Sequence, residues 1–336
     1  MKHKINKHKY IFIKETKKRI VRAIIIRRDS SPWLLRKGGR ESKEMSSSVS
    51  AMAACALKPR ILPRFLRARM STSLSCAAAS SDSDLRVYSR RSGIPYASGL
   101  AWQRKLQNDV LSGRHSEHAL LLLEHDPPVY TLGRRASLDH ILFDVDSQRE
   151  GIALHSRSVA TGSDTCLGTA TILGECAEIH RVERGGEVTW HGPGQLVGYS
   201  ILNLAKAPLK QDLHWYLRQI EEVVIRSLGA VGINDAARHP EYTGVWVGDS
   251  KVAAVGLSVS KWVTMHGFAI NVNPDLGAFR RIVPCGISKE DTGKNVSSVR
   301  EILGEDAAID IAAFRSIVEN EFASVFHLRA AAGEYL

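Results

Sequence analysis

The chain has 336 residues, of which 44% are hydrophobic and 24% are charged, and its formal net charge at pH 7 is +11. That charge is confined to one end: residues 1–84 contain 20 Lys and Arg against 6 Asp and Glu, whereas residues 85–336 contain 26 against 29. The mildly acidic body argues against a nucleic-acid-binding domain. No apolar run approaches the ~18 residues of a membrane span, so we expect a soluble protein that binds neither nucleic acid nor membrane.

Residues 1–84 have the composition of a targeting sequence rather than of a folded domain. From Met45 onward the chain is rich in Ser, Ala and Arg, and it carries no acidic residue before Asp82. This composition is typical of an organelle transit peptide. We therefore predict a disordered basic leader over residues 1–84 with its true start at Met45, and a folded domain over residues 85–330. The Ser/Ala-rich start followed by arginines favours the plastid stroma over the mitochondrial matrix, and a basic nucleic-acid-binding arm is the alternative.

The five cysteines indicate a reduced compartment and no metal site. Cys55 and Cys76 lie in the leader, which leaves Cys166, Cys176 and Cys285, an odd number for a disulfide framework. The chain contains no CxxC pair and no Cys/His spacing of the kind that binds zinc.

Hydrophobic periodicity predicts helices and strands in alternation along the body. The predicted helices are residues 98–113, 212–229 and 311–325; the predicted strands are residues 119–124, a short strand ending at Gly133, residues 195–204, a hairpin over 243–259 that turns at 248–250, and a strand within 261–276. Strands cluster in the middle with helices between and after them. We expect one α+β domain with a mixed β-sheet.

The helix over 212–229 has the clearest pattern. Asp212 is the expected N-cap and Gly229 the expected stop. The expected buried stripe consists of Leu213, Leu217, Ile220, Val224 and Leu228.

A glycine-rich segment, "ERGGEVTWHGPGQLVGY" over residues 183–199, is a candidate ligand loop. Four of its glycines, Gly185, Gly186, Gly192 and Gly194, lie within ten residues and allow the backbone to approach a ligand where a Cβ would clash. The order of its residues matches neither a phosphate-binding P-loop nor the dinucleotide fingerprint GxGxxG. A glycine-rich hairpin with one hydrogen-bonded histidine explains the spacing equally well.

Lys251 and Cys285 each have a structural and a chemical interpretation. Lys251 opens a half-buried strand, where a lysine is usually a solvated edge residue; the alternative is a charge directed into a pocket lined by Ala253, Ala254 and Gly256. Cys285 follows Pro284 at the end of an apolar run and is either a buried apolar residue or a nucleophile held at a turn. An ammonium about 4 Å from a thiol would lower the thiol pKa by one to three units.

Five blocks of sequence resemble the lipoyl(octanoyl) transferase family, of the organelle-targeted kind found in plant plastids. The blocks are "HDPPVYTLGRR", "RVERGGEVTWHGPGQLVGYSILNL", "DLHWYLRQIEEVVI", "GVWVGDSKVAAVGLSVSKWVTMHGFAINVNPDL" and "FRRIVPCGI". They stand in the family's order and span nearly all of residues 85–325. The resemblance implies the fold of the biotin- and lipoate-protein ligase catalytic domains.

The same resemblance implies an acyltransferase that needs no cofactor. It would transfer an octanoyl group from octanoyl-acyl carrier protein to a lysine of lipoyl-domain E2 subunits or of the glycine cleavage H protein, as the first step of endogenous protein lipoylation. Cys285 matches the acyl-accepting nucleophile and Lys251 the lysine that lowers its pKa. The matching substrate-binding residues are Arg184, Gly185, Gly186, Glu187, Val188, Thr189, Trp190, His191, Ala254, Val255, Gly256, Gly267, Phe268 and Ala269.

Two other functions remain as alternatives. An ATP-dependent lipoate- or biotin-protein ligase of the same fold would activate a free acid and need no cysteine. A non-catalytic protein that binds lipoyl domains or acyl chains could dispense with Lys251 and Cys285.

Residues 159–178, "VATGSDTCLGTATILGECAE", depart from the family pattern. The stretch shows no clear period, and we expect it to be an atypical insertion. It would be either a surface loop, whose added length costs little entropy, or a retained intron of the gene.

Overall fold

The computed structural model describes residues 84–90, 92–143, 165–172, 174–283, 293–304 and 306–334, all within the compact unit Ser73–Leu336. The predicted leader, with Met45, lies outside the described residues apart from its last position, Asp84. Within the described ranges, no helix is both long enough and apolar enough to cross a membrane.

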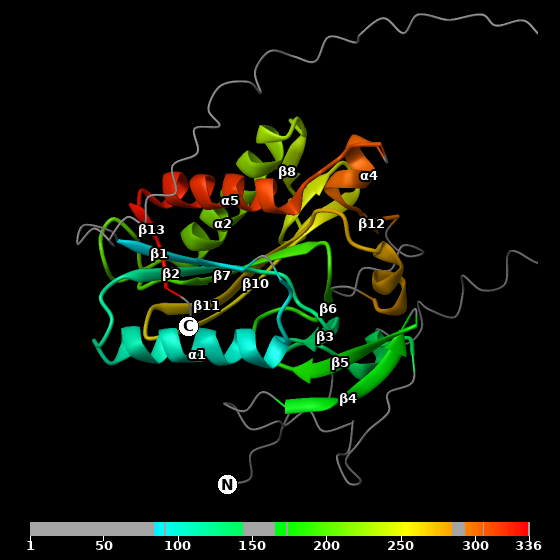
Figure 1. Ribbon diagram of the computed structural model, residues 1–336, viewed down its shortest axis with the longest axis horizontal. Helices are drawn as coiled ribbons and strands as arrows, with labels where there is room; N and C mark the ends of the chain where they lie inside the picture. Colours follow the sequence, from blue (N-terminus) through cyan, green and yellow to red (C-terminus); the bar gives the residue numbers. More distant parts are fainter. Residues whose placement is uncertain are drawn as a thin grey trace, which may run out of the picture. The chain divides into compact units, whose positions relative to one another are not determined.

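A large mixed sheet forms the centre of the domain (Figure 1). The order of its strands in the sheet is β13-β1-β2-β7-β11-β10-β9-β8, and β12 pairs with β10. The strands are β1 (Leu85–Ser89), β2 (His118–Leu123), β7 (Gln195–Ile201), β8 (Ala236–Arg238), β9 (Val245–Val247), β10 (Ser250–Ser260), β11 (Val263–Asn271), β12 (Asn295–Val296) and β13 (Ala330–Ala332). The pairs β1–β13, β1–β2 and β10–β12 are parallel and the other pairs are antiparallel, so the predicted mixed sheet is confirmed.

A second, four-stranded sheet lies against the first and has the order β4-β5-β3-β6. Its strands are β3 (Val129–Leu132), β4 (Thr165–Ile172), β5 (Glu175–Arg181) and β6 (Val188–His191). The strand β3 pairs in parallel with β5 and antiparallel with β6. This smaller sheet was not predicted as a separate layer.

The expectation that residues 159–178 form a surface loop is wrong for the part that the structure describes. Residues 165–172 and 175–178 belong to the antiparallel pair β4–β5. Ala170 and Ala177 are buried in the core of the small sheet, whereas Cys166 and Cys176 are exposed free thiols. The alternation of small apolar with polar residues is too weak to be recognised as a strand pattern.

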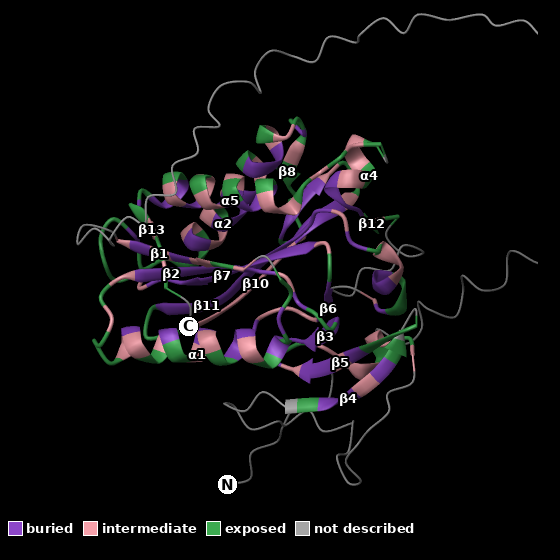
Figure 2. Ribbon diagram, in the orientation of Figure 1, coloured by how far each residue is buried: buried purple, intermediate pink, exposed green. Residues whose placement is uncertain are grey.

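Helices cover the two faces of the large sheet (Figure 1). The helices α2 (Leu213–Ala230) and α5 (Ile311–Phe326) cover one face, and α1 (Tyr96–Leu111) covers the other. The short α4 (Val299–Leu303) follows β12, and single 3-10 turns span Leu138–His140 and Leu276–Arg281. The central strands are buried over most of their length (Figure 2).

Of the two predicted ends of α2, the N-cap is confirmed and the C-terminal stop is wrong. The Asp212 side chain accepts hydrogen bonds from the backbone N–H groups of His214 and Trp215, at 2.8 and 3.1 Å, as an N-cap should. Gly229, however, lies inside the helix, which continues to Ala230. Leu213 is 40% exposed because it is the first helical residue and extends past the core; Tyr216 and Val223 complete the buried stripe instead.

Candidate active site

The three glycine- and alanine-rich stretches singled out from the sequence meet at one pocket. It lies on the face of the large sheet that α1 covers, between β10, β11 and the loop that precedes β6. Its lining consists of Tyr96, Arg184, Gly185, Gly186, Thr189, His191, Val197, Tyr199, Ala254, Val255, Gly256, His266, Gly267, Phe268 and Ala269. The free space between these walls is about 50 Å³.

Arg184 fastens the glycine-rich loop to the small sheet. Its Nη2 donates to the carbonyl oxygen and the Oγ1 of Thr131 on β3, at 2.7 and 2.8 Å, and its Nη1 donates to the carbonyl of Gly185 at 3.0 Å. The guanidinium is buried, with 8% of the residue exposed. Several of its N–H groups donate hydrogen bonds to other groups of the protein. Arg184 therefore shapes the pocket wall in addition to contributing charge to it.

The same loop contacts β10 through backbone groups. The N–H of Gly185 donates to the carbonyl of Leu257 at 2.9 Å. A Cβ at Gly256 would lie 3.2 Å from the carbonyl oxygen of Gly185, so a side chain at this position would push the loop away from the strand. Small residues on β10 therefore allow the loop and the sheet to approach closely enough to form one wall.

A buried hydrogen-bond chain connects His191 with the strand of Lys251. The Nδ1 of His191 donates to Oε1 of Gln195 at 2.7 Å, and Nε2 of Gln195 donates to Oδ1 of Asn271 at 2.9 Å. Nδ2 of Asn271 donates to the carbonyl of Ser297 at 3.0 Å, and the N–H of Ser297 donates to the carbonyl of Lys251 at 3.0 Å. All five residues are buried, and a buried chain in which each amide is satisfied holds its members in one arrangement.

Lys251 is a buried residue, contrary to the solvated-edge interpretation. Only 8% of it is exposed, and its Nζ lies 5.5 Å from the centre of the Trp246 ring. Gly244 supports it from the adjacent turn: a Cβ there would lie 2.7 Å from Cε of Lys251. The N–H of Gly244 is in turn held by Oε1 of the buried Glu221 on α2, at 3.1 Å.

Cys285 lies outside the residues that the structure describes. The described chain before it ends at Val283, whose N–H donates to the carbonyl of His140 at 2.9 Å. The described chain after it enters β12, where Val296 pairs with Lys251. The pairing of Cys285 with Lys251 therefore stays a prediction from the sequence.

Three of the predicted substrate-binding residues do not line the pocket. Glu187 faces His140, with Oε2 3.3 Å from Nδ1, and Val188 is buried in the core of the small sheet. Trp190 also belongs to that core, where its ring packs edge-on against Phe279. Alternation along β6 explains the difference, because Thr189 and His191 point to the opposite side from Val188 and Trp190.

Sequence reasoning missed several residues of the site. Tyr96 comes from α1 and Tyr199 from β7, and no local motif connects either with the glycine-rich loop. Gln195 and Asn271 were not predicted either, although both lie in the motif blocks. A buried amide inside a strand is the signal that could have identified them, since such a group needs a partner.

The histidines of the site are neutral at physiological pH. Burial, with a smaller contribution from the nearby His125, lowers the pKa of His191 to about 3. Burial together with the charge of Arg184 lowers the pKa of His266 to about 3 as well. Burial also lowers the pKa of His125 to about 4; its Nδ1 lies 3.0 Å from the carbonyl of Ile94, so its Nε2 accepts from the Tyr199 hydroxyl at 2.6 Å. These rings can exchange hydrogen bonds with a ligand but carry no charge.

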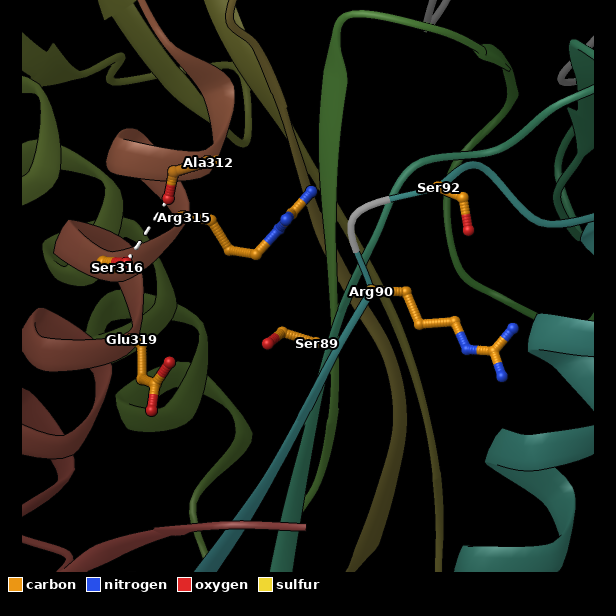
Figure 3. A pocket seen from close by; sticks show the side chains of 7 residues that line it. All are labelled: Ser89, Arg90, Ser92, Ala312, Arg315, Ser316 and Glu319. Carbon is orange, nitrogen blue, oxygen red and sulfur yellow. Dashed lines mark hydrogen bonds between the residues drawn. The ribbon is translucent and has the colours of Figure 1, made fainter. Parts of the chain in front are cut away.

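A larger cavity, of about 580 Å³, lies between α5 and the end of β1 and is lined by Ser89, Arg90, Ser92, Ala312, Arg315, Ser316 and Glu319 (Figure 3). Arg315 donates from Nη2 to Glu124 at 3.0 Å, which compensates its charge. Arg90 extends away from α5, with its guanidinium 5.1 Å from the centre of the Trp102 ring (Figure 3). Both arginines interact with groups outside the cavity, and the lining contains one carboxyl group, that of Glu319. The described residues that line this cavity therefore show no convergent set of reactive groups. We place the chemistry in the smaller pocket.

Comparison with known proteins finds octanoyltransferases among the similar proteins. The family model of the lipoyl protein ligase A/B catalytic domain matches residues 95–323, which include every residue of the pocket. An octanoyltransferase of Nostoc punctiforme is 48% identical over 200 residues, which cover 60% of this chain and 74% of the relative. The chloroplastic octanoyltransferase LIP2p2 of Arabidopsis thaliana is 36% identical over 286 residues, covering 80% and 89%. A bipartite lipoate protein ligase of Thermoplasma acidophilum, of known structure, overlaps with a TM-score of 0.46 at 16% identity, covering 75% and 88%.

Proposed function

The chain belongs to the lipoyl protein ligase A/B catalytic-domain family, as an octanoyltransferase, and from this membership we propose that it moves an octanoyl group from acyl carrier protein to a lysine of lipoyl-domain proteins through a cysteine thioester. The acceptors would be E2 subunits of 2-oxoacid dehydrogenases or the glycine cleavage H protein. The chloroplastic relative and the Ser/Ala-rich leader support a plastid location.

The observation that carries the proposal is the convergence of the family's motif blocks on one pocket. The loop Arg184–Gly186, the strand segment Ala254–Gly256 and the segment Gly267–Ala269 are far apart in sequence and line it together. Lys251 lies three residues before Ala254 on the same strand, buried and fixed by the Gly244 turn. An octanoyl chain brings about six methylenes, worth roughly 5 kcal/mol when buried, and the lining offers the apolar walls for it.

In the first step the Cys285 thiolate attacks the thioester carbonyl of octanoyl-acyl carrier protein. The carbon–sulfur bond to the carrier breaks, the carrier's thiolate leaves and takes a proton from the Lys251 ammonium, and the octanoyl group remains on Cys285 as a new thioester. A buried ammonium at Lys251 favours the thiolate over the thiol, whose ordinary pKa is about 8.5. Backbone N–H groups near Cys285 would stabilise the oxyanion of the tetrahedral intermediate.

In the second step the ε-amine of the acceptor lysine attacks the octanoyl-enzyme. The amide forms, the Cys285 thiolate leaves, and the proton lost by the attacking amine passes to a base. An amine with a pKa near 10.4 must first be deprotonated, and Lys251 is suited to relay that proton once Cys285 no longer carries a negative charge.

The test is a transfer assay without nucleotide. Octanoyl-acyl carrier protein and a lipoyl-domain acceptor are mixed with the enzyme, and the acceptor is followed by mass spectrometry. We expect an octanoylated acceptor without ATP. Transfer that requires free octanoate and ATP would identify an ATP-dependent ligase instead, and an acceptor left unmodified under both conditions would favour a protein that only binds acyl chains.

A further inference from the structure

In the register of the paired strands β10 and β11, His266 lies beyond the Ala254–Ala269 level, on the side away from Lys251. On the paired strands β10 and β11, Ala254 is opposite Ala269, and His266 is opposite Leu257. Lys251 precedes Ala254 by three residues, and Leu257 follows it by three. The pocket lining therefore extends along the two strands to His266 at one end, and Lys251, which is not among the lining residues, lies on β10 three residues before the start of the lining.

The distance from the Ala254–Ala269 level to His266 matches the length of an eight-carbon acyl chain. Three residues of a strand span about 10 Å, the distance from the Ala254–Ala269 level to the His266 level. A zigzag of ~1.5 Å bonds at ~111° advances about 1.25 Å per bond, so the seven C–C bonds of an octanoyl group span about 9 Å. An acyl group whose carbonyl lies at the level of Ala254 would end at His266.

The backbone of His266 is bent in a way that brings its ring to this position. Its φ is +65°, in the left-handed region that side chains other than glycine seldom adopt. Phe268, two residues on, is buried beneath α2 and α5, and strict alternation would place His266 on that same side. Instead its ring lies edge-on to Tyr199, on the face that α1 covers, and lines the pocket. Local strain of this kind persists where the surrounding structure holds it, and often marks a functional position.

A buried glutamine holds the strained backbone in place. Oε1 of Gln103, on α1, accepts a hydrogen bond from the N–H of His266 at 2.9 Å. Gln103 is fully buried. The backbone at His266 is thus held both by its own strand and by α1, and its buried ring forms part of the pocket wall.

The ring also presents an unsatisfied polar atom. Nε2 of His266 is buried and has no hydrogen-bond partner among the described residues. Methylene groups that reach this atom cannot satisfy it, so an acyl chain that extends past His266 would meet both a fixed ring and an unpaired nitrogen.

We propose that His266 is the end stop of the acyl channel and limits the accepted acyl chain to about eight carbons. The inference rests on the proposed octanoyl transfer and adds the residue that determines chain length. His266 is in this role a specificity residue and takes no part in the chemical step.

The experiment compares acyl carrier proteins loaded with C6, C8, C10 and C12 chains, using the full chain and its His266→Gly variant. Glycine adopts the left-handed backbone without strain, so this variant removes the ring and retains the path of the strand. The wild-type kcat/KM should peak at C8. In His266→Gly the ratio of kcat/KM for C12 to that for C8 should rise at least tenfold, since about four more methylenes gain burial.

Two further variants serve as controls for effects of the substitution on folding. His266→Asn, a residue that tolerates the left-handed region, should shift the optimum toward C10. His118→Asn removes another buried histidine, on β2 and outside the pocket, and should leave the ratio unchanged whatever its effect on stability.

The possible outcomes separate this inference from the proposed function. A parallel loss for all chain lengths in both His266 variants would show that His266 only supports the fold, and would overturn the inference. Equal wild-type rates for C8 and C12 would also overturn it. A wild-type enzyme that transfers no acyl chain from the carrier would refute the proposed function itself, and the end stop with it.

Discussion

Nε2 of Gln195 donates a hydrogen bond to Oδ1 of Asn271 at 2.9 Å, and this single contact joins the strand that follows the His191 loop to the network beneath Lys251. The two residues lie 76 positions apart in sequence. Through them the glycine-rich loop and the strand that carries Lys251 keep a fixed relation.

Gln195→Leu should disturb both ends of this network. The substitution leaves the Nδ1–H of His191 and the Oδ1 of Asn271 without their partners. Each buried group left unsatisfied costs about 1–3 kcal/mol. We expect kcat/KM for octanoyl transfer to fall by about 10- to 100-fold and the melting temperature to fall by several degrees.

Asn203→Ala is the matched control for that variant. Asn203 Oδ1 accepts from the N–H of Ala205 in a turn outside the pocket. Its loss should lower stability slightly and leave kcat/KM unchanged. A Gln195→Leu enzyme that loses stability but retains full kcat/KM would show that the network does not position the site.

Gly244→Ala should displace the part of β10 that carries Lys251. The φ of Gly244 is +118°, and the new methyl group would clash with the carbonyl oxygen of Ala253 and lie 2.7 Å from Cε of Lys251. We expect the rate of acyl-enzyme formation to fall at least tenfold. Gly248→Ala is the control, because φ is +56° there and no atom lies within 4 Å of the new Cβ. Both variants incur backbone strain of about 1–2 kcal/mol, so equal rates of acylation in the two would contradict a positioning role for Gly244.

Stability should decline as the pH falls below about 6.5. In the folded protein, burial lowers the pKa of His118 and His125 to about 4, and that of His191 and His266 to about 3. In the unfolded chain these histidines titrate near 6.5. Below that pH the unfolded state binds protons that the folded state does not, so the stabilisation is complete above 6.5 and is lost as pH falls toward 4 and 3.

Each of these histidines should remove about 1 kcal/mol of stability between pH 7 and pH 5.5. Denaturant titrations at the two pH values measure the difference. His118→Gln removes one titrating group. The slope of its unfolding free energy against pH should therefore be smaller than that of wild type, by the equivalent of about one proton. An identical slope in wild type and variant would mean that His118 does not titrate differently in the two states.

Gly229→Ala should stabilise the protein. Gly229 lies inside α2, and no atom lies within 4 Å of the Cβ that alanine would add. Replacing a helical glycine with alanine gains about 1 kcal/mol, which corresponds to roughly 2–4 °C in melting temperature for a domain of this size. Gly232→Ala, just beyond the helix at a φ of +99°, should have the opposite effect.

Local patterns predicted those parts of the fold that depend on neighbours in sequence. The Asp212 cap needs only the two backbone N–H groups that follow it, and the turn between β9 and β10 needs only Gly248 and Asp249. The small sheet was not predictable in this way. Its strand β5 pairs in parallel with β3, whose residues lie about 50 positions earlier, and no local periodicity indicates that pairing.

The sequence motifs predicted part of the candidate site, as local patterns predicted part of the fold. Motif blocks identified the glycine-rich loop and the small residues of β10 and β11, because close backbone approach requires such residues wherever it occurs. They also placed His266 on a strand that could line the same cavity, which the pocket lining confirms, but alternation did not predict its left-handed backbone. They did not identify Tyr96, which α1 brings to the pocket from a distant part of the chain.

The central claim is that Cys285 carries the octanoyl group, and the most direct test is the intact mass of the enzyme after mixing with octanoyl-acyl carrier protein alone. We expect a gain of one octanoyl group in wild type and in a Cys166→Ser/Cys176→Ser variant, which lacks the two exposed thiols of the β4–β5 pair. The gain should be absent in Cys285→Ala. An adduct that persists in Cys285→Ala, or a folded wild-type enzyme that gains no mass while still octanoylating its acceptor, would contradict the cysteine acyl-enzyme.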